Sequence, residues 1–142
     1  MDSGMCEKPV EVVEKLWGRE LQIVTFRTDM VNGYSGKILE VDGNGKCCSV
    51  HYHKRKVETF YELVGNLRIQ LWKFKTGCFG EDSLDAIELT SDSVLRVGHA
   101  LTIYPYIPHR FWSVCGQCRF VEFSTPDSPD DSYRIIPSGL VE

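Results

Sequence analysis

Short segments with the composition of β-strands recur along most of the chain, and turn residues separate them. Residues 21–26 and 36–41 are two such segments, and the second ends at Asp42-Gly43-Asn44-Gly45, a strong turn signal. Further strands are expected at residues 48–53, 58–64, 66–74, 94–97, 101–103, 112–114, 119–123 and 132–136. Many brief strands with little helix are typical of an antiparallel sandwich or barrel, so we expect an all-β fold.

Helix is expected in one place only, the short stretch from Pro9 to Leu16. A chain of 142 residues is long enough to bury a core without disulfide support and predicts one domain. We expect that domain over residues 9–142, opening with a short helix or extension, after a flexible N-terminus at residues 1–8.

Charge and hydropathy exclude several classes of function. The net charge of −4 argues against a nucleic-acid binder, which normally presents a basic face. No apolar run approaches the roughly 20 residues that span a bilayer, so no membrane partner is expected. The stretch from Met1 to Glu7 is acidic and lacks the apolar core of a signal peptide, which predicts a cytoplasmic protein.

The six cysteines are expected to stay reduced, because no secretory signal precedes them. Cys115 and Cys118 have the spacing of half a zinc site or of a redox pair, but no second such pair is present. Gly116-Gln117 also fits a two-residue hairpin turn between residues 111–114 and 119–123. We favour the hairpin and keep the redox or metal pair as the alternative.

Two histidines one residue apart carry the strongest chemical signal in the chain. Side chains alternate along a strand, so His51 and His53 face the same side, and a turn then allows the next strand to bring Glu58 to the same place. A Pro-rich turn leads into a strand that presents His109. Two or three imidazoles and a carboxylate at one point are metal ligands far more readily than core neighbours. We therefore expect one divalent metal ion per chain.

At these residues the chain resembles the cupin superfamily. The first cupin motif, G-x5-H-x-H-x4-E-x6-G, is matched at every fixed position, by Gly45, His51, His53, Glu58 and Gly65. The second motif, G-x5-P-x-G-x2-H-x3-N, is matched at its first glycine and its histidine, Gly98 and His109. Its other fixed positions hold Tyr104, Tyr106 and Ser113.

The resemblance implies a double-stranded β-helix, the cupin jelly-roll barrel, with His51, His53, Glu58 and His109 holding the metal near its mouth. Zn, Mn, Fe, Co and Ni all suit this ligand set. More loosely, the chain also resembles small single-domain cupins, which are grouped with sugar isomerases of the mannose-6-phosphate and lyxose type. We therefore expect a metal-dependent isomerase or epimerase of a sugar or sugar phosphate. An iron-dependent dioxygenase and a non-catalytic metal- or sugar-binding module remain alternatives.

Other residues are assigned roles around this site. Glu58 serves as ligand, base or both, Lys37 favours developing negative charge, and Glu62 shares the face of Glu58 unless a bulge returns it to solvent. The expected contacts of a small-molecule substrate, a sugar, are Tyr106, Phe111 and Arg134.

Two further features leave alternatives open. Residues 54–56, Lys-Arg-Lys, form either a solvated loop, which we favour, or a phosphate clamp. An apolar outer sheet face or an exposed sheet edge would make the protein a homodimer.

Overall fold

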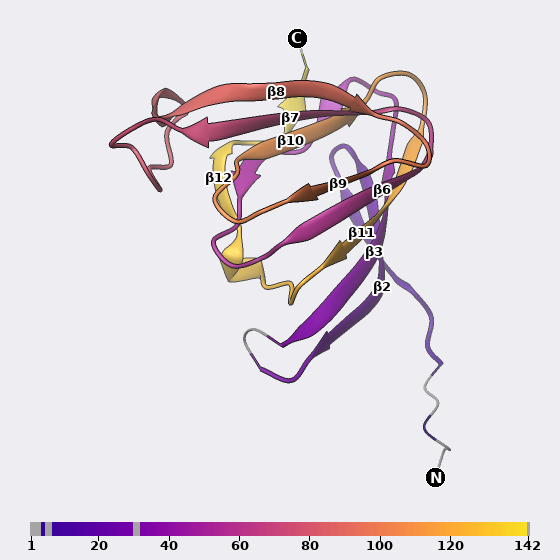
Figure 1. The fold of residues 1–142 in the computed structure, drawn as a ribbon. Helices are drawn as coiled ribbons and strands as arrows, with labels where there is room; N and C mark the ends of the chain where they lie inside the picture. Colours follow the sequence, from indigo (N-terminus) through magenta and orange to yellow (C-terminus); the bar gives the residue numbers. More distant parts are fainter. Residues whose placement is uncertain (1–3, 5–6, 30–31, 142) are drawn as a thin grey trace.

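The computed structural model describes Gly4, residues 7–29 and residues 32–141, and its strands form two facing antiparallel sheets (Figure 1). In chain order the strands are β1 Glu11–Lys15, β2 Gly18–Arg27, β3 Gly33–Val41, β4 Lys46–Cys47, β5 Val50–Tyr52, β6 Glu58–Val64, β7 Leu67–Phe74, β8 Ile87–Leu95, β9 Ala100–Ile103, β10 His109–Ser113, β11 Cys118–Ser124, β12 Tyr133–Ile136 and β13 Gly139–Leu140. Two 3-10 turns, η1 Leu84–Ala86 and η2 Pro129–Asp131, are the only helical segments in the described residues.

The larger sheet has the order β1-β2-β3-β11-β6-β9, and the smaller has the order β12-β5-β10-β7-β8. A two-stranded ribbon, β4 with β13, accompanies them. The neighbours in each sheet are mostly distant in sequence, which gives a jelly-roll-like arrangement. The prediction of an all-β fold is confirmed.

The core lies between the two sheets, where the strands alternate buried and exposed side chains. Its main cluster is built from both sheets and includes Leu39, Phe60, Ile69, Phe111 and Phe120. Phe60 packs against the rings of Phe111 and Phe120, with centroids 5.9 Å and 4.7 Å away. Buried rings in tilted and edge-on contact stabilise this end of the sandwich. Polar residues lie between the sheets at the other end.

The helix predicted for Pro9 to Leu16 is wrong. Residues 11–15 form the edge strand β1, paired in register with β2 from Glu11 opposite Gln22 to Lys15 opposite Gly18. The β-branched pair Val12-Val13 favours extended backbone, and the ladder with β2 supplies hydrogen bonds that a helix this short would not outweigh. Most of the N-terminal stretch expected to be flexible, residues 1–8, lies outside the described residues.

The hairpin predicted around Gly116-Gln117 is also wrong. Strand β10 pairs with β5 and β7, whereas β11 pairs with β3 and β6, so the connection crosses from one sheet to the other. Local turn chemistry cannot distinguish a hairpin from such a crossing. Cys118 is buried and Cys115 is exposed, and neither forms a disulfide.

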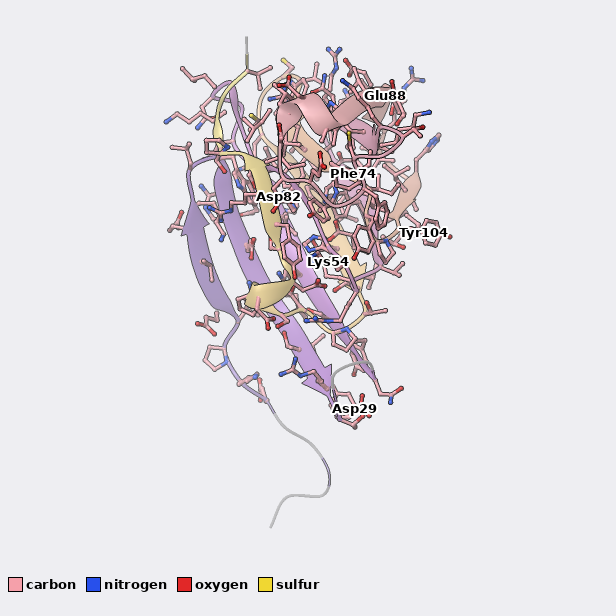
Figure 2. The ribbon with its side chains drawn as sticks, turned by 90° about the vertical axis from the view of Figure 1, so that its left-hand side faces the viewer. Asp29, Lys54, Phe74, Asp82, Glu88 and Tyr104 are labelled. Carbon is pink, nitrogen blue, oxygen red and sulfur yellow. The ribbon has the colours of Figure 1, made fainter. Side chains whose placement is uncertain are left out.

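Strands β2 and β3 extend beyond the rest of the larger sheet as a long hairpin. Asp29 lies near its tip, at the far end of the molecule from Glu88, which follows the start of β8 (Figure 2). No helix among the described residues is long and apolar enough to cross a bilayer.

Candidate metal centre

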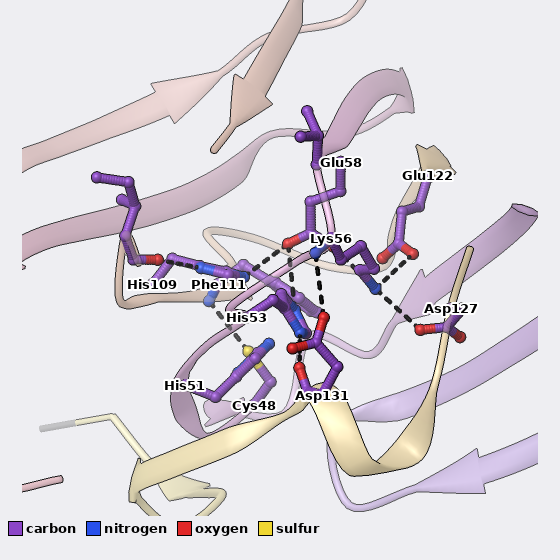
Figure 3. Close-up of polar contacts among 12 residues, drawn as sticks. Cys48, His51, His53, Lys56, Glu58, His109, Phe111, Glu122, Asp127 and Asp131 are labelled. Atoms are coloured by element: carbon purple, nitrogen blue, oxygen red, sulfur yellow. Dashed lines mark hydrogen bonds and ion pairs between the residues drawn. The ribbon is translucent and has the colours of Figure 1, made fainter. Parts of the chain in front are cut away.

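Strand pairing brings the histidines together. His109 on β10 lies directly opposite His51 on β5, so both side chains project from the same face of the smaller sheet. His53 follows the end of β5 on the same side, and the ring centroids of His51 lie 4.4 Å from His109 and 5.2 Å from His53. One ring nitrogen from each of the three histidines lies within 4.8 Å of the others (Figure 3). The sequence prediction that these three converge is confirmed.

Each imidazole is oriented by a main-chain carbonyl. The Nδ1 atoms of His51, His53 and His109 lie 2.9, 2.7 and 2.8 Å from the carbonyl oxygens of Ser49, Asp131 and Ile107 respectively. A carbonyl oxygen can only accept a hydrogen bond, so each Nδ1 carries the proton and donates it. The Nε2 lone pairs are therefore free to bind a metal ion, and the carbonyls fix the ring orientations.

Burial keeps two of the histidines, His51 and His53, in the neutral form that binds metal. Desolvation lowers the pKa of His51 well below its usual range, and the neighbouring His109 and His53 lower it further. Desolvation also lowers the pKa of His53 to about 4, against the opposing effect of Glu58. Both imidazoles are thus unprotonated at neutral pH without first having to release a proton.

Glu58 on β6 completes the donor set from the facing sheet. Its Oε1 lies 2.7 Å from Nε2 of His109 and 3.7 Å from Nε2 of His53. Both histidine atoms carry lone pairs in the tautomer described above, so a cation or a proton is needed between them and the carboxylate. Glu58 Oε1 and His53 Nε2 are buried with no hydrogen-bond partner among the described residues. Three imidazoles and this carboxylate therefore fit a divalent ion.

Asp131, which the sequence analysis missed, organises the loop between the ligand strands. Its carboxylate accepts hydrogen bonds from three successive main-chain N–H groups, those of Lys54, Arg55 and Lys56, at 2.9, 3.2 and 3.0 Å. Its own carbonyl accepts the bond from His53 Nδ1. One buried residue of η2 thus orients a ligand and fixes the turn that leads to Glu58.

Asp131→Asn is expected to weaken metal binding by about 10–100-fold, the usual cost of disturbing a partner of a metal ligand. The amide has one accepting oxygen where the carboxylate has two, so the loop loses at least one bond to a buried N–H group. Competition with a chelating dye measures the affinity. Asp130→Asn is the matched control, because Asp130 is exposed and its 3.5 Å ion pair with Arg55 is weak. Unchanged affinity in Asp131→Asn would contradict this role.

A buried network of charges forms the wall next to Glu58 (Figure 3). Lys56 Nζ lies 3.1 Å from Glu58, 3.3 Å from Glu122 and 3.2 Å from Asp127. Lys37 Nζ lies 2.6 Å from Asp127 and 4.0 Å from Glu122. The two ammonium groups compensate for the burial of several negative charges.

The carboxyl groups of this wall differ in their affinity for protons. Burial raises the pKa of Glu122, and its neighbours Glu58 and Asp127 add to that rise against the ammonium groups. Asp127 is only partly buried, and Lys56 and Lys37 hold its pKa at about 2. Asp127 is therefore permanently ionised, whereas Glu122 is the group able to take up and release a proton.

The pocket above the histidines has a volume of about 470 Å³. Among the residues predicted to contact substrate, Arg134 and Phe111 line it, as does the predicted positioning residue Lys37. Arg134 reaches the pocket because it lies opposite His51 in the β12–β5 ladder. Trp17, edge-on to Phe111 at 5.1 Å, adds a second aromatic wall.

Two predicted site residues lie elsewhere. Glu62 faces the interior, as strand alternation indicated, but it lies beyond Phe60 with the Cys118 thiol 3.1 Å from Oε2, and it does not line the pocket. Burial raises its pKa to about 7. Tyr106 packs between Tyr52 and Phe79 away from the histidines, with its ring stacked 4.4 Å from that of Phe79.

The loop Lys54-Arg55-Lys56 combines two environments. Lys54 and Arg55 are exposed, in agreement with the prediction of a solvated loop, but Lys56 is buried against Glu58, where that prediction is wrong. Lys56 precedes Glu58 by two residues, so strand periodicity was a usable signal. The same periodicity places Glu122 on the face of the core residue Phe120.

No family model matches the sequence, and no curated protein matches it. Three structural comparisons are informative. CapF, a capsular polysaccharide assembling protein of Staphylococcus aureus, superposes with a TM-score of 0.70 at 13% identity over 96% of this chain and 34% of its own. Oxalate decarboxylase from Bacillus subtilis gives 0.68 at 14% identity over 94% and 34%. KdgF from Halomonas sp. gives 0.60 at 12% identity over 84% and 91%.

All three proteins have the cupin fold, and this chain shares it. The chain spans about a third of the length of CapF and of oxalate decarboxylase. At identities this low the likeness concerns the fold alone. The fold implied by the histidine motif is confirmed, and the resemblance to sugar isomerases stays a prediction.

Proposed function

We propose that this protein is a metal-dependent enzyme that removes a proton from a sugar carbon next to the carbonyl and returns it to the neighbouring carbon, as an isomerase, or to the same carbon, as an epimerase. The observation that carries this proposal is the convergence of one ring nitrogen from each of the three histidines, with a Glu58 oxygen that has no hydrogen-bond partner among the described residues, beside a pocket lined by His51, His53, Glu58 and Glu122. Metal ligands and a proton acceptor lining one pocket are what such a reaction requires.

A divalent ion on His51, His53, His109 and Glu58 would supply Lewis-acid stabilisation of the negative charge that develops on a sugar oxygen. Zn, Mn, Fe, Co and Ni all suit this donor set. With Glu58 as a ligand, Glu122, which lines the same pocket, is the better candidate for the base. Its raised pKa suits a group that removes a proton from one carbon and returns it to the next.

The lining of the pocket supports a hydroxylated substrate. Gln22, Ser49 and Ser132 offer hydrogen bonds, while Trp17 and Phe111 offer apolar faces on which a sugar ring can lie. The name of the structural neighbour CapF, a capsular polysaccharide assembling protein, supports a link to carbohydrates.

The charges of the pocket lining are compatible with a sugar or a sugar phosphate. Four carboxylates line the pocket, Glu20, Glu58, Glu122 and Asp127. Four cationic side chains, Lys15, Lys37, Lys56 and Arg134, line it as well, so these charges cancel and a divalent ion would leave the site positive. Arg134, exposed at the rim, is then the contact for a polar group at the far end of the substrate.

Proton exchange with solvent tests the proposal directly. The chelated protein is reloaded with Zn, Mn, Fe(II), Co or Ni, and a panel of aldoses and ketoses is incubated with it in D₂O. We expect at least one metal and one sugar to give deuterium at the carbon next to the carbonyl, detected by NMR. The chelated protein is the control.

Two other results would overturn this reading. Metal binding without deuterium incorporation into any sugar would identify a binding module. Oxygen uptake that requires Fe(II) would identify the dioxygenase alternative.

A further inference from the structure

The outer face of the larger sheet carries an apolar row across five strands. The register aligns Val12 with Leu21, Leu21 with Ile38, Ile38 with Val121, and Val121 with Tyr61. Val12 is 51% exposed and Tyr61 is 39% exposed. These residues alternate with Glu20, Lys37 and Glu122, which line the pocket, so the row faces away from the core.

More apolar side chains lie beside this row. Phe123 is 56% exposed, and Phe26 lies opposite Tyr34 with the ring centroids 5.7 Å apart. Phe26, Tyr34, Tyr61 and Phe123 are each about half exposed, and a fully exposed aromatic side chain presents about 150–250 Å², so together they leave about 400 Å² uncovered. Val10 and Val12 enlarge this area. The largest apolar patch on a monomer is typically about 300–600 Å² in total.

On the other side of the apolar row lies a row of alternating charge. The register aligns Glu14, Arg19, Glu40 and Arg119 on β1, β2, β3 and β11. Within the chain, Arg19 lies 3.6 Å from Glu14 and 3.3 Å from Glu40, and Arg119 lies 2.5 Å from Glu40. The order of signs is negative, positive, negative, positive.

We propose that this face binds a second copy of the chain, with the two-fold axis parallel to the strands and between β2 and β3. Such a rotation reverses the order of the strands and keeps each row at its own level. Arg119 then faces Glu14 of the partner subunit, and Arg19 faces Glu40 of the partner subunit. A row of four alternating charges is complementary to its own reverse, which is what a symmetric interface requires.

The same rotation brings apolar residues together. Leu21 faces Ile38 of the partner subunit, and Val121 faces Val12 of the partner subunit. Sheets that pack face to face keep their strands nearly aligned, and this arrangement satisfies that preference. A stable interface needs about 800 Å² per partner, so the aliphatic and charged rows have to contribute area beside the aromatic side chains. The pocket opens on the inner side of the sheet, so dimerisation leaves it accessible.

Val121→Glu tests the apolar row, because it places a charge opposite Val12 of the partner subunit without changing the core. We expect sedimentation velocity to give a dimer for the native chain and at least about a 30-fold rise in the dissociation constant for the variant. Thr102→Glu, on the outer face of the edge strand β9, is the control and should remain dimeric. A native chain that is monomeric at 100 µM, roughly the upper range of such an experiment, would overturn the proposal.

A charge exchange tests the geometry. Arg119→Glu places a negative charge opposite Glu14 of the partner subunit and should weaken the dimer, and Glu14→Arg should weaken it equally. Within one chain, Glu14→Arg places a like charge beside Arg19, and Arg119→Glu places a like charge beside Glu40. The double variant keeps both of these repulsive contacts. Recovery of the dimer in the double variant could therefore come only from the restored ion pair between the two subunits. Additive weakening would overturn the proposed axis.

Discussion

Replacing His53 with alanine is expected to abolish tight binding of a divalent ion. The substitution removes one of three converging nitrogens and leaves Glu58 Oε1 facing an incomplete set of metal ligands. Loss of a partner that merely orients a ligand costs about 10–100-fold in affinity, so loss of the ligand itself should exceed about 100-fold. Elemental analysis after dialysis should give about one metal ion per chain for the native protein, the stoichiometry of a mononuclear site, and none for the variant.

The chain provides a matched control for this experiment. His99 is exposed and lies between β8 and β9, outside the histidine cluster, so His99→Ala should retain the metal. Circular dichroism should show the same β-structure in both variants. Full metal content in His53→Ala with the fold intact would show that His53 is not a ligand, and a native protein without metal would overturn the enzyme proposal.

Glu122→Gln should lower the rate of deuterium incorporation by about 10²–10⁴-fold, the usual contribution of a general base. The amide keeps the shape of the side chain but cannot accept the proton. Metal content should be unchanged, because Glu122 reaches the ligand Glu58 only through Lys56. The exchange rate is measured by NMR on the loaded protein, with elemental analysis on the same sample.

Glu40→Gln is the corresponding control, since Glu40 lies on the outer face of the same sheet and pairs with Arg19 and Arg119. It should exchange at the native rate. Loss of metal in Glu122→Gln would instead show that Glu122 helps to position the metal ligands. A native exchange rate would assign the base to another group of the pocket.

The ligands could be predicted from the sequence because their placement depends on local rules. His51 and His53 share a face through strand alternation, and the spacing to Glu58 matches a specific motif. The residues that support them could not all be found in this way. Asp131 acts on His53 from 78 residues away, and no local pattern indicates that contact.

The errors in the fold have the same origin. The segment Glu11–Lys15 is too short to identify from periodicity, and its pairing with β2 determined its conformation. The turn after β10 has hairpin composition, but the strands on either side belong to different sheets. In both cases a partner elsewhere in the chain decided between two locally acceptable structures.

The bond between His53 and Asp131 has a consequence for synthesis. A ribosome that adds about 5–20 residues per second needs roughly 4–16 s to proceed from one residue to the other. His51 and His53 are made at the start of that interval and His109 within it, but the carbonyl that orients His53 and the carboxylate that holds the loop are made only at its end. The nascent chain therefore offers a passing ion imidazoles that Asp131 has not yet oriented, and selective uptake of the metal belongs to the finished protein.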